Sequence, residues 1–259
     1  MRHAPLLLAL CVVPAAAVPV IAATQSDRDA PFLPTPMTAV EAMLDLAEVG
    51  PGDSVIDLGS GDGRIAIAAA QRGATALGIE IDPDLVRRAR LHARDAGVEQ
   101  RVRFRGENLF DTPIRGADVV TLYLLPDLNL RLRPRLLTEL APGARVVSHA
   151  FDMADWVPDA HRQAEDRNIY LWIVPAIVGG EWRLTLADGS VHALSFGQRF
   201  QRAEGTFDGV AITNVALRGT KFAFGAGAQR FHGIVGERTI MPDPAGPASA
   251  VKGWSASRL

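Results

Sequence analysis

Apolar and polar residues follow different patterns in the two parts of the chain. Up to about residue 170, short apolar runs alternate with segments whose apolar residues recur at helical spacing. This alternation predicts an α/β fold with a parallel, doubly wound, Rossmann-like sheet. The first expected helix has Thr38 as its cap, and the others lie near 63–72, 83–96 and 128–140. The expected strands lie near 54–57, 75–81, 102–105, 117–123 and 145–149.

After about residue 170 the helical spacing disappears and only short alternating runs remain. Turn signals such as Asp188-Gly189 and Arg218-Gly219 lie between runs and favour hairpins. We expect an α/β domain over residues 24–174 and a C-terminal all-β domain, a small sandwich or partial barrel, over residues 175–259. Its expected strands are 182–186, 191–200, 211–217, 221–224, 230–235 and 253–257, with a loop at 242–247. Its aromatic residues are more typical of a core than of a ligand cavity: Phe196, Phe200, Phe222, Phe224 and Phe231.

The first expected strand leads into a glycine-rich turn, which is the most informative motif in the chain. Asp57 ends the strand, and Gly59, Ser60, Gly61 and Gly63 follow it. Such glycines let the backbone approach a ligand closely. The dinucleotide fingerprint requires a further glycine where this chain has Arg64. The pattern instead looks like motif I of the class I S-adenosylmethionine methyltransferases, which predicts that these residues bind that cofactor.

Polar residues also follow the next two expected strands. Glu80 ends the second strand and is placed to accept from both hydroxyls of a ribose, while Asp82 before Pro83 is placed to cap the next helix. Asn108 or Glu107 follows the third strand, where the methyltransferase pattern has a polar side chain on the adenine amino group. Glu80 and Asn108 are therefore the expected cofactor ligands.

Several further motifs occur in the order found in one family. The region 31–160 resembles the small lysine methyltransferases whose animal members modify the ATP synthase c-subunit and the adenine nucleotide translocase. The resemblance implies S-adenosylmethionine as the donor and an amine acceptor, either a protein lysine or a small amine. It also implies that Thr35 lies near the cofactor and that Tyr123 to Pro126 line the acceptor channel. The motifs are Pro34-Thr35-Pro36, Asp57–Arg64, Tyr123-Leu124-Leu125-Pro126, Pro142–Ser148, Phe151 and Trp156–Asp159.

The N-terminus indicates export, which conflicts with a cofactor made in the cytosol. Residues 4–23 are uncharged and apolar, follow Arg2, and end in small residues. This is typical of a signal peptide over residues 1–23, although an uncleaved segment of this length could anchor the protein in a membrane. We expect a periplasmic or membrane-anchored protein. The single cysteine, Cys11, lies inside this segment, so the rest of the chain forms no disulfide.

Composition removes some function classes and leaves one alternative. The net charge is −2 and no basic run exceeds Arg87-Arg88, which disfavours a nucleic-acid partner. The histidines lack metal-ligand spacing, so we expect no metal site; His149 is a candidate base as well as a core residue. The alternative to a methyltransferase is an exported binding protein whose β domain holds a lipid or peptide. A nucleotide-dependent oxidoreductase is disfavoured by Arg64.

Overall fold

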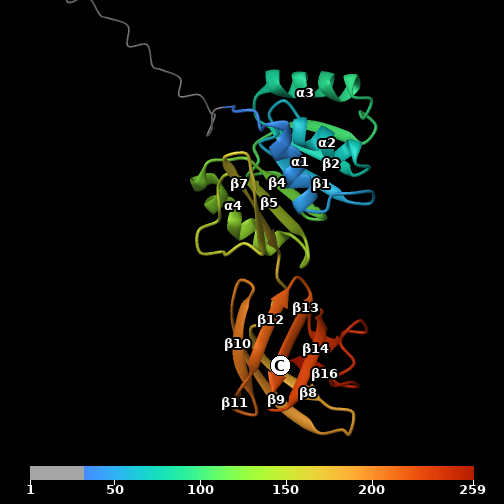
Figure 1. Cartoon of the computed structure of the whole chain (residues 1–259), viewed down its shortest axis with the longest axis vertical. Helices are drawn as coiled ribbons and strands as arrows, with labels where there is room; N and C mark the ends of the chain where they lie inside the picture. The colour runs from blue at the N-terminus through green and yellow to red at the C-terminus, as the bar shows by residue number, and fades with distance from the viewer. Residues whose placement is uncertain (1–31) are drawn as a thin grey trace, which may run out of the picture.

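The structure is a computed structural model that describes residues 32–259. The predictions made for residues 1–23 therefore lie outside the described residues. Within residues 32–259, no helix has the length and hydropathy that a membrane crossing requires. Figure 1 shows two bodies of structure joined by the segment that follows β7, one built of helices and a sheet and the other built of strands.

The first body is a seven-stranded sheet in the order β3-β2-β1-β4-β5-β7-β6. The first five strands in this order pair in parallel, and β7 and β6 add an antiparallel edge. This confirms the predicted doubly wound α/β fold. The strands are β1 (Ser54–Leu58), β2 (Thr75–Glu80), β3 (Val102–Gly106), β4 (Val119–Leu122), β5 (Arg145–His149), β6 (Ala160–Ala164) and β7 (Arg167–Ile173). The helices are α1 (Met37–Leu46), α2 (Arg64–Gln71), α3 (Pro83–Asp95) and α4 (Pro126–Glu139).

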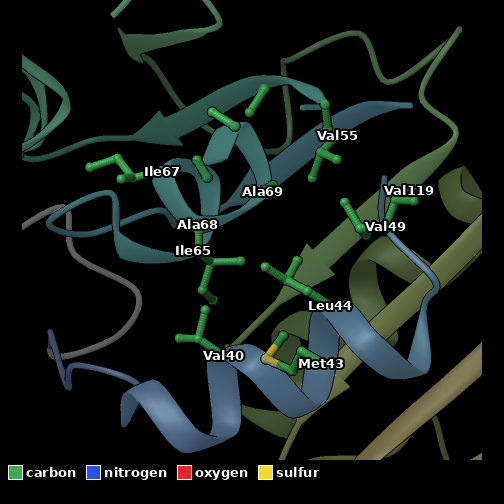
Figure 2. Packing of buried hydrophobic residues seen from close by; sticks show 14 of the residues in the cluster. Val40, Met43, Leu44, Val49, Val55, Ile65, Ile67, Ala68, Ala69 and Val119 are labelled. Carbon is green, nitrogen blue, oxygen red and sulfur yellow. The ribbon is translucent and has the colours of Figure 1, made fainter. Parts of the chain in front are cut away.

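Helices cover both faces of this sheet because neighbouring strand residues point to opposite sides. Val55 and Val119 belong to the apolar cluster under α1, α2 and α3, as Figure 2 shows for the side chains of the first two helices. Their neighbours Ile56 and Val120 belong to a second cluster under α4. The strands are therefore buried on both faces, which accounts for the short apolar runs within them.

One expectation for the first body is wrong, and two of its strands were not predicted. Thr38 is not a cap, because α1 begins at Met37 with Pro36 before it and without a side-chain capping bond; the Thr38 hydroxyl donates instead to Glu165. The strands β6 and β7 were not predicted. The edge strand β6 is largely exposed and carries no apolar alternation, so its sequence resembles that of a loop.

The second body is a nine-stranded antiparallel sheet in the order β11-β10-β9-β8-β16-β15-β14-β13-β12. Its two margins meet, since β10 contacts β12, and the sheet is nearly closed. This confirms the predicted all-β fold, although β10 and β15 were not predicted. The strands are β8 (Gly180–Thr185), β9 (Val191–Arg199), β10 (Arg202–Phe207), β11 (Val210–Ala211), β12 (Thr213–Arg218), β13 (Lys221–Ala226), β14 (Gln229–Val235), β15 (Thr239–Pro242) and β16 (Ser255–Arg258).

Aromatic side chains fill the second sheet, as expected, with one exception. Phe224 stacks on Phe231 with ring centroids 4.8 Å apart, and both are buried in the core of this sheet. Phe200 lies instead in the turn after β9 and stacks on Trp156 of the first body, with ring centroids 6.0 Å apart. Arg199 forms an ion pair with Asp155 beside it. Phe200 therefore joins the two bodies and is not part of the second core.

Candidate active site

A cavity of about 700 Å³ opens at the carboxyl ends of β1, β2 and β4. This is where doubly wound sheets bind ligands. Seven of the predicted site residues line it: Thr35, Gly59, Ser60, Gly61, Glu80, Asn108 and Tyr123. The other three predicted site residues, Asp57, Gly63 and Pro126, lie outside the lining of the cavity.

The glycine turn needs its glycines for different reasons. Gly59, Gly61 and Gly63 all have a positive φ, at 80°, 54° and 85°, which strains any residue with a side chain. The amides of Gly59 and Ser60 both donate to the carbonyl of Ile79 at 2.8 Å, which ties the turn to β2. A Cβ on Gly63 would lie 2.6 Å from the Phe104 ring. Gly63 is therefore required because the turn packs against β3 at this point. Gly61 is required because the Phe32 ring lies directly against it.

Asp57 supports the turn from below. It is 1% exposed, and the Thr121 hydroxyl donates to its Oδ1 at 2.6 Å. Its Oδ2 is buried and has no hydrogen-bond partner among the described residues. Burial raises the pKa of Asp57 from 3.8 to about 7, although the Thr121 bond acts in the opposite direction. A buried carboxyl with one unsatisfied oxygen is costly to ionise, and retention of its proton relieves part of that cost.

Glu80 lies at the end of β2 and holds the turn as well as lining the cavity. Its Oε2 accepts from the Gly61 amide and its Oε1 accepts from the Asp82 amide, both at 2.9 Å. A carboxylate has further lone pairs that can accept from ligand hydroxyls. Asp82 caps α3 by accepting from the Asp84 amide at 2.9 Å, which confirms its predicted role.

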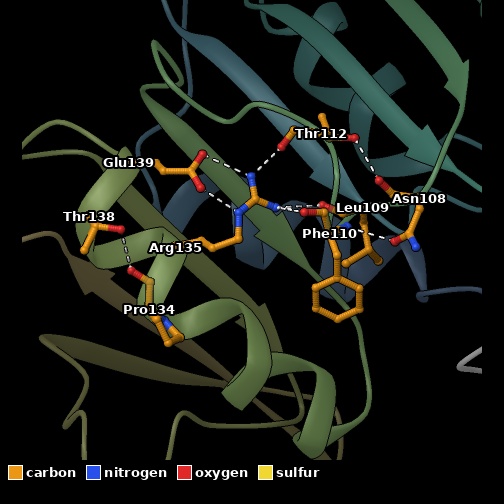
Figure 3. A network of polar contacts seen from close by, with 8 residues as sticks. All are labelled: Asn108, Leu109, Phe110, Thr112, Pro134, Arg135, Thr138 and Glu139. Carbon is orange, nitrogen blue, oxygen red and sulfur yellow. Dashed lines mark hydrogen bonds and ion pairs between the residues drawn. The ribbon is translucent and has the colours of Figure 1, made fainter.

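Asn108 belongs to a loop that α4 supports from beneath. Its side-chain oxygen accepts from the Phe110 amide at 2.9 Å, so the amide group is held by its own loop. Arg135 donates to the carbonyl oxygens of Phe110 and Thr112, both at 2.6 Å, and pairs with Glu139 (Figure 3). This pairing with the Arg135 guanidinium lowers the pKa of the Glu139 carboxyl. The predicted adenine contact of Asn108 therefore rests on a buttressed loop, a support that its sequence did not indicate.

The far end of the cavity has aromatic walls. Tyr123 follows the end of β4, and its ring lies 6.5 Å from that of Phe151, centroid to centroid, with an interplanar angle of 15°. Behind it, His149 is 2% exposed and its ring centroid is 4.2 Å from that of Tyr123. Burial lowers the pKa of His149, so the imidazole is neutral near pH 7. Pro126 is an exposed residue at the first position of α4, outside the cavity lining.

The resemblance implied that Thr35 lies near the cofactor, but it did not indicate that the residues before it also wall the cavity near the glycine turn. Residues 32–35, which we call the strap, line the cavity just before α1. The Phe32 ring covers the turn closely enough that a Cβ on Gly61 would lie 2.5 Å from it. Thr35 is 4% exposed, and its carbonyl accepts from Arg64. The prolines at 34 and 36 mark an extended segment, but no local pattern indicates what it crosses.

The residues present fit S-adenosylmethionine. The strand order places Asn108, Glu80, the glycine turn and Tyr123 in succession along one edge of the sheet. This succession offers a polar loop for a base, a carboxylate for a ribose, a close backbone approach and then an apolar end. No group of three or more metal-ligating side chains occurs within residues 32–259.

Comparison with known proteins agrees with this geometry. The family described as the ANTKMT methyltransferase domain matches residues 57–160. A protein-lysine N-methyltransferase of Saccharolobus islandicus is 41% identical over 150 residues, which cover 56% of this chain and 93% of that protein. The chain belongs to this methyltransferase family. It is a SAM-dependent methyltransferase, as its motifs predicted, and nothing in the comparisons supports the binding-protein alternative.

Animal and bacterial proteins of related sequence each match about half of this methyltransferase. The adenine nucleotide translocase lysine N-methyltransferase of Mus musculus is 40% identical over 131 residues, 50% of this chain and 57% of that enzyme. A Salinibacter ruber structure described as an RNA methyltransferase, in complex with S-adenosyl-L-homocysteine, is 51% identical, with a TM-score of 0.55. It covers 56% of this chain and 96% of its own.

Proposed function

We propose that this methyltransferase transfers the methyl group of S-adenosylmethionine to the side-chain amine of a protein lysine. The observation that carries the proposal is the aromatic end of the cavity, where Tyr123 and Phe151 form walls beyond the glycine turn. The apolar and aromatic side chains at this end can pack along the methylene stem of a lysine while its amine reaches the reacting methyl group. The archaeal and animal relatives, which are named as lysine methyltransferases, support the same acceptor.

The acceptor amine must lose its proton before it can attack. When bound, S-adenosylmethionine supplies an electrophilic methyl group, so the protein has to align the amine and keep it neutral. The walls of Tyr123, Phe151 and Leu125 favour the neutral amine by excluding water. His149 is neutral and packs behind Tyr123, where it fixes the plane of the tyrosine ring. The amine proton leaves toward solvent at the mouth of the cavity.

An RNA acceptor is the second candidate, because the Salinibacter ruber structure is described as an RNA methyltransferase. The charge of this chain argues against it. Phosphate binding needs a concentrated basic face, whereas the net charge is −2 and the basic residues are dispersed.

Transfer of a radioactive methyl group decides between these acceptors. The purified enzyme is incubated with methyl-labelled S-adenosylmethionine and a cell-envelope or cytosolic extract, and portions are then treated with protease or ribonuclease. We expect protease-sensitive label that yields methyl-lysine on acid hydrolysis. The matched control is Gly61→Val, which should transfer no label. Ribonuclease-sensitive label, or label in another amino acid, would refute the lysine proposal.

A further inference from the structure

Arg64 joins the glycine turn to the strap. Its Nε and Nη2 donate to the two carboxylate oxygens of Asp62, at 2.9 and 2.6 Å. Its Nη1 donates to the carbonyl oxygen of Thr35 at 2.8 Å. In the described part of the chain, no other hydrogen bond links residues 32–35 to the turn or the sheet. Among the described residues, this guanidinium therefore supplies the hydrogen bond that ties the strap to the turn.

The ion pair that orients Arg64 is itself well anchored. The fork of the guanidinium meets both carboxylate oxygens, which fixes its plane. The Asp62 side chain is 9% exposed and that of Arg64 is 28% exposed. Burial raises the pKa of Asp62, but the bonds and charge of Arg64 outweigh this, so that pKa lies below its usual range. The Asp62 carbonyl oxygen also lies 3.1 Å from Nδ1 of His92 on α3.

This pairing argues against Arg64 as a receptor for a ligand carboxylate. Its positive charge is already matched by Asp62, and three of its five N–H groups are engaged. The strap also covers part of the cavity beside the glycine turn. Phe32 lies over Gly61 and both line the cavity, so a displaced strap would open the cavity beside the turn.

We propose that Arg64 is a positioning residue for cofactor binding. Paired with Asp62, it holds the Thr35 carbonyl and keeps Phe32 against the glycine turn as one wall of the cofactor cavity. The bound cofactor is then shielded from water on this side, and its escape requires the strap to move. The proposal depends on cofactor binding alone and not on the identity of the acceptor.

The test measures binding of S-adenosyl-L-homocysteine to the full chain by calorimetry and its dissociation rate by stopped flow. The variants are Arg64→Ala, Phe32→Ala and the double variant, with melting temperature recorded for each. We expect each single variant to weaken binding about tenfold, mainly through faster dissociation. The double variant should be no weaker than either single one, because both changes release the same strap.

Arg72 provides the matched control. It lies one residue beyond α2, is 23% exposed at its side chain, and pairs with Glu41 and Asp45 of α1. Arg72→Ala removes a similar guanidinium from the same region and should leave ligand affinity unchanged. Arg64→Lys keeps the charge but cannot make the bidentate pair, so it should resemble Arg64→Ala and also covers the case in which the alanine variant does not fold.

Three results would overturn the proposal. The first is an affinity of Arg64→Ala and Arg64→Lys equal to that of the wild type. The second is full additivity of the Arg64 and Phe32 effects, which would mean that Arg64 acts on the ligand by itself. The third is an equal loss of affinity in Arg72→Ala. A missing lysine acceptor would affect none of these measurements, so failure of the acceptor proposal remains distinguishable.

Discussion

Asp57 should make the stability of this methyltransferase depend on pH in an unusual direction. The carboxyl is 1% exposed and its pKa is raised by burial from 3.8 to about 7. The folded protein therefore retains this proton up to about pH 7, whereas the unfolded chain loses it near pH 4. Between these values the folded state binds more protons, so the contribution of Asp57 to the free energy of unfolding falls as pH rises.

The size of this effect follows from the pKa values. A pKa raised from 3.8 to about 7 corresponds to about 4 kcal/mol of destabilisation above pH 7, relative to a neutral residue. Between pH 5 and pH 8 the change is about 2.5 kcal/mol. Asn is the matched neutral substitution, because its amide oxygen can still accept from the Thr121 hydroxyl. Asp57→Asn should therefore be more stable than the wild type, and increasingly so as pH rises.

Urea unfolding of both proteins at pH 5, 6, 7 and 8, without ligand, measures the difference. Subtracting the wild-type free energy of unfolding from that of the Asp57→Asn variant at each pH cancels the titration of all other groups. We expect this difference to widen with pH by about 2.5 kcal/mol. Parallel curves would show that Asp57 ionises with an ordinary pKa, and the assignment of its unsatisfied oxygen would then be wrong.

Four substitutions and one fusion test the remaining assignments. Tyr123→Ala should lower the single-turnover methylation rate far more than cofactor affinity, and a parallel loss of rate, affinity and melting temperature would remove Tyr123 from the site. Glu80→Ala should weaken cofactor binding about ten- to a hundredfold, whereas Asp82→Ala should cost about 1 kcal/mol of stability with little loss of binding; the reverse ranking in calorimetry would exchange their roles. Gly61→Val should abolish cofactor binding, since its Cβ would lie 2.5 Å from the strap, and normal binding would refute the turn assignment. Residues 1–23 fused to a reporter that is active only outside the cytoplasm should give activity, and an inactive but expressed fusion would refute export.

Local sequence patterns predicted the strands that are buried on both faces of the sheet, because such burial requires apolar residues. The strands β1, β2, β4 and β5 each contain a short apolar run, because helices cover both sides of them. The edge strand β6 is exposed and shows no such run, so it could not be distinguished from a loop. The turn phenylalanine Phe200 fits the alternation of the second sheet, yet it packs on Trp156 of the first. Its partner is fixed by the placement of the two bodies, which no local pattern encodes.

The residues of the candidate site likewise include some that could be predicted from the sequence and some that could not. Residues at or just after the end of a buried strand, such as Glu80 and Tyr123, could be assigned because parallel strands end at one edge of the sheet. The supports of the site could not, because each joins segments far apart in the chain. Arg135 holds the loop of Asn108 from a different element, and its helical setting on α4 does not indicate that contact.

Arg64 shows why a motif can exclude a function and still conceal one. In the sequence it serves as evidence against a dinucleotide site, since a glycine is needed there for close packing of helix and strand. The structure meets that packing demand one residue earlier, at Gly63, where a Cβ would lie 2.6 Å from Phe104. The next position is thereby free to carry a long side chain, and this chain uses it to reach Thr35. The shift of one glycine thus permits a contact between the cofactor turn and the strap that a dinucleotide-binding turn could not make.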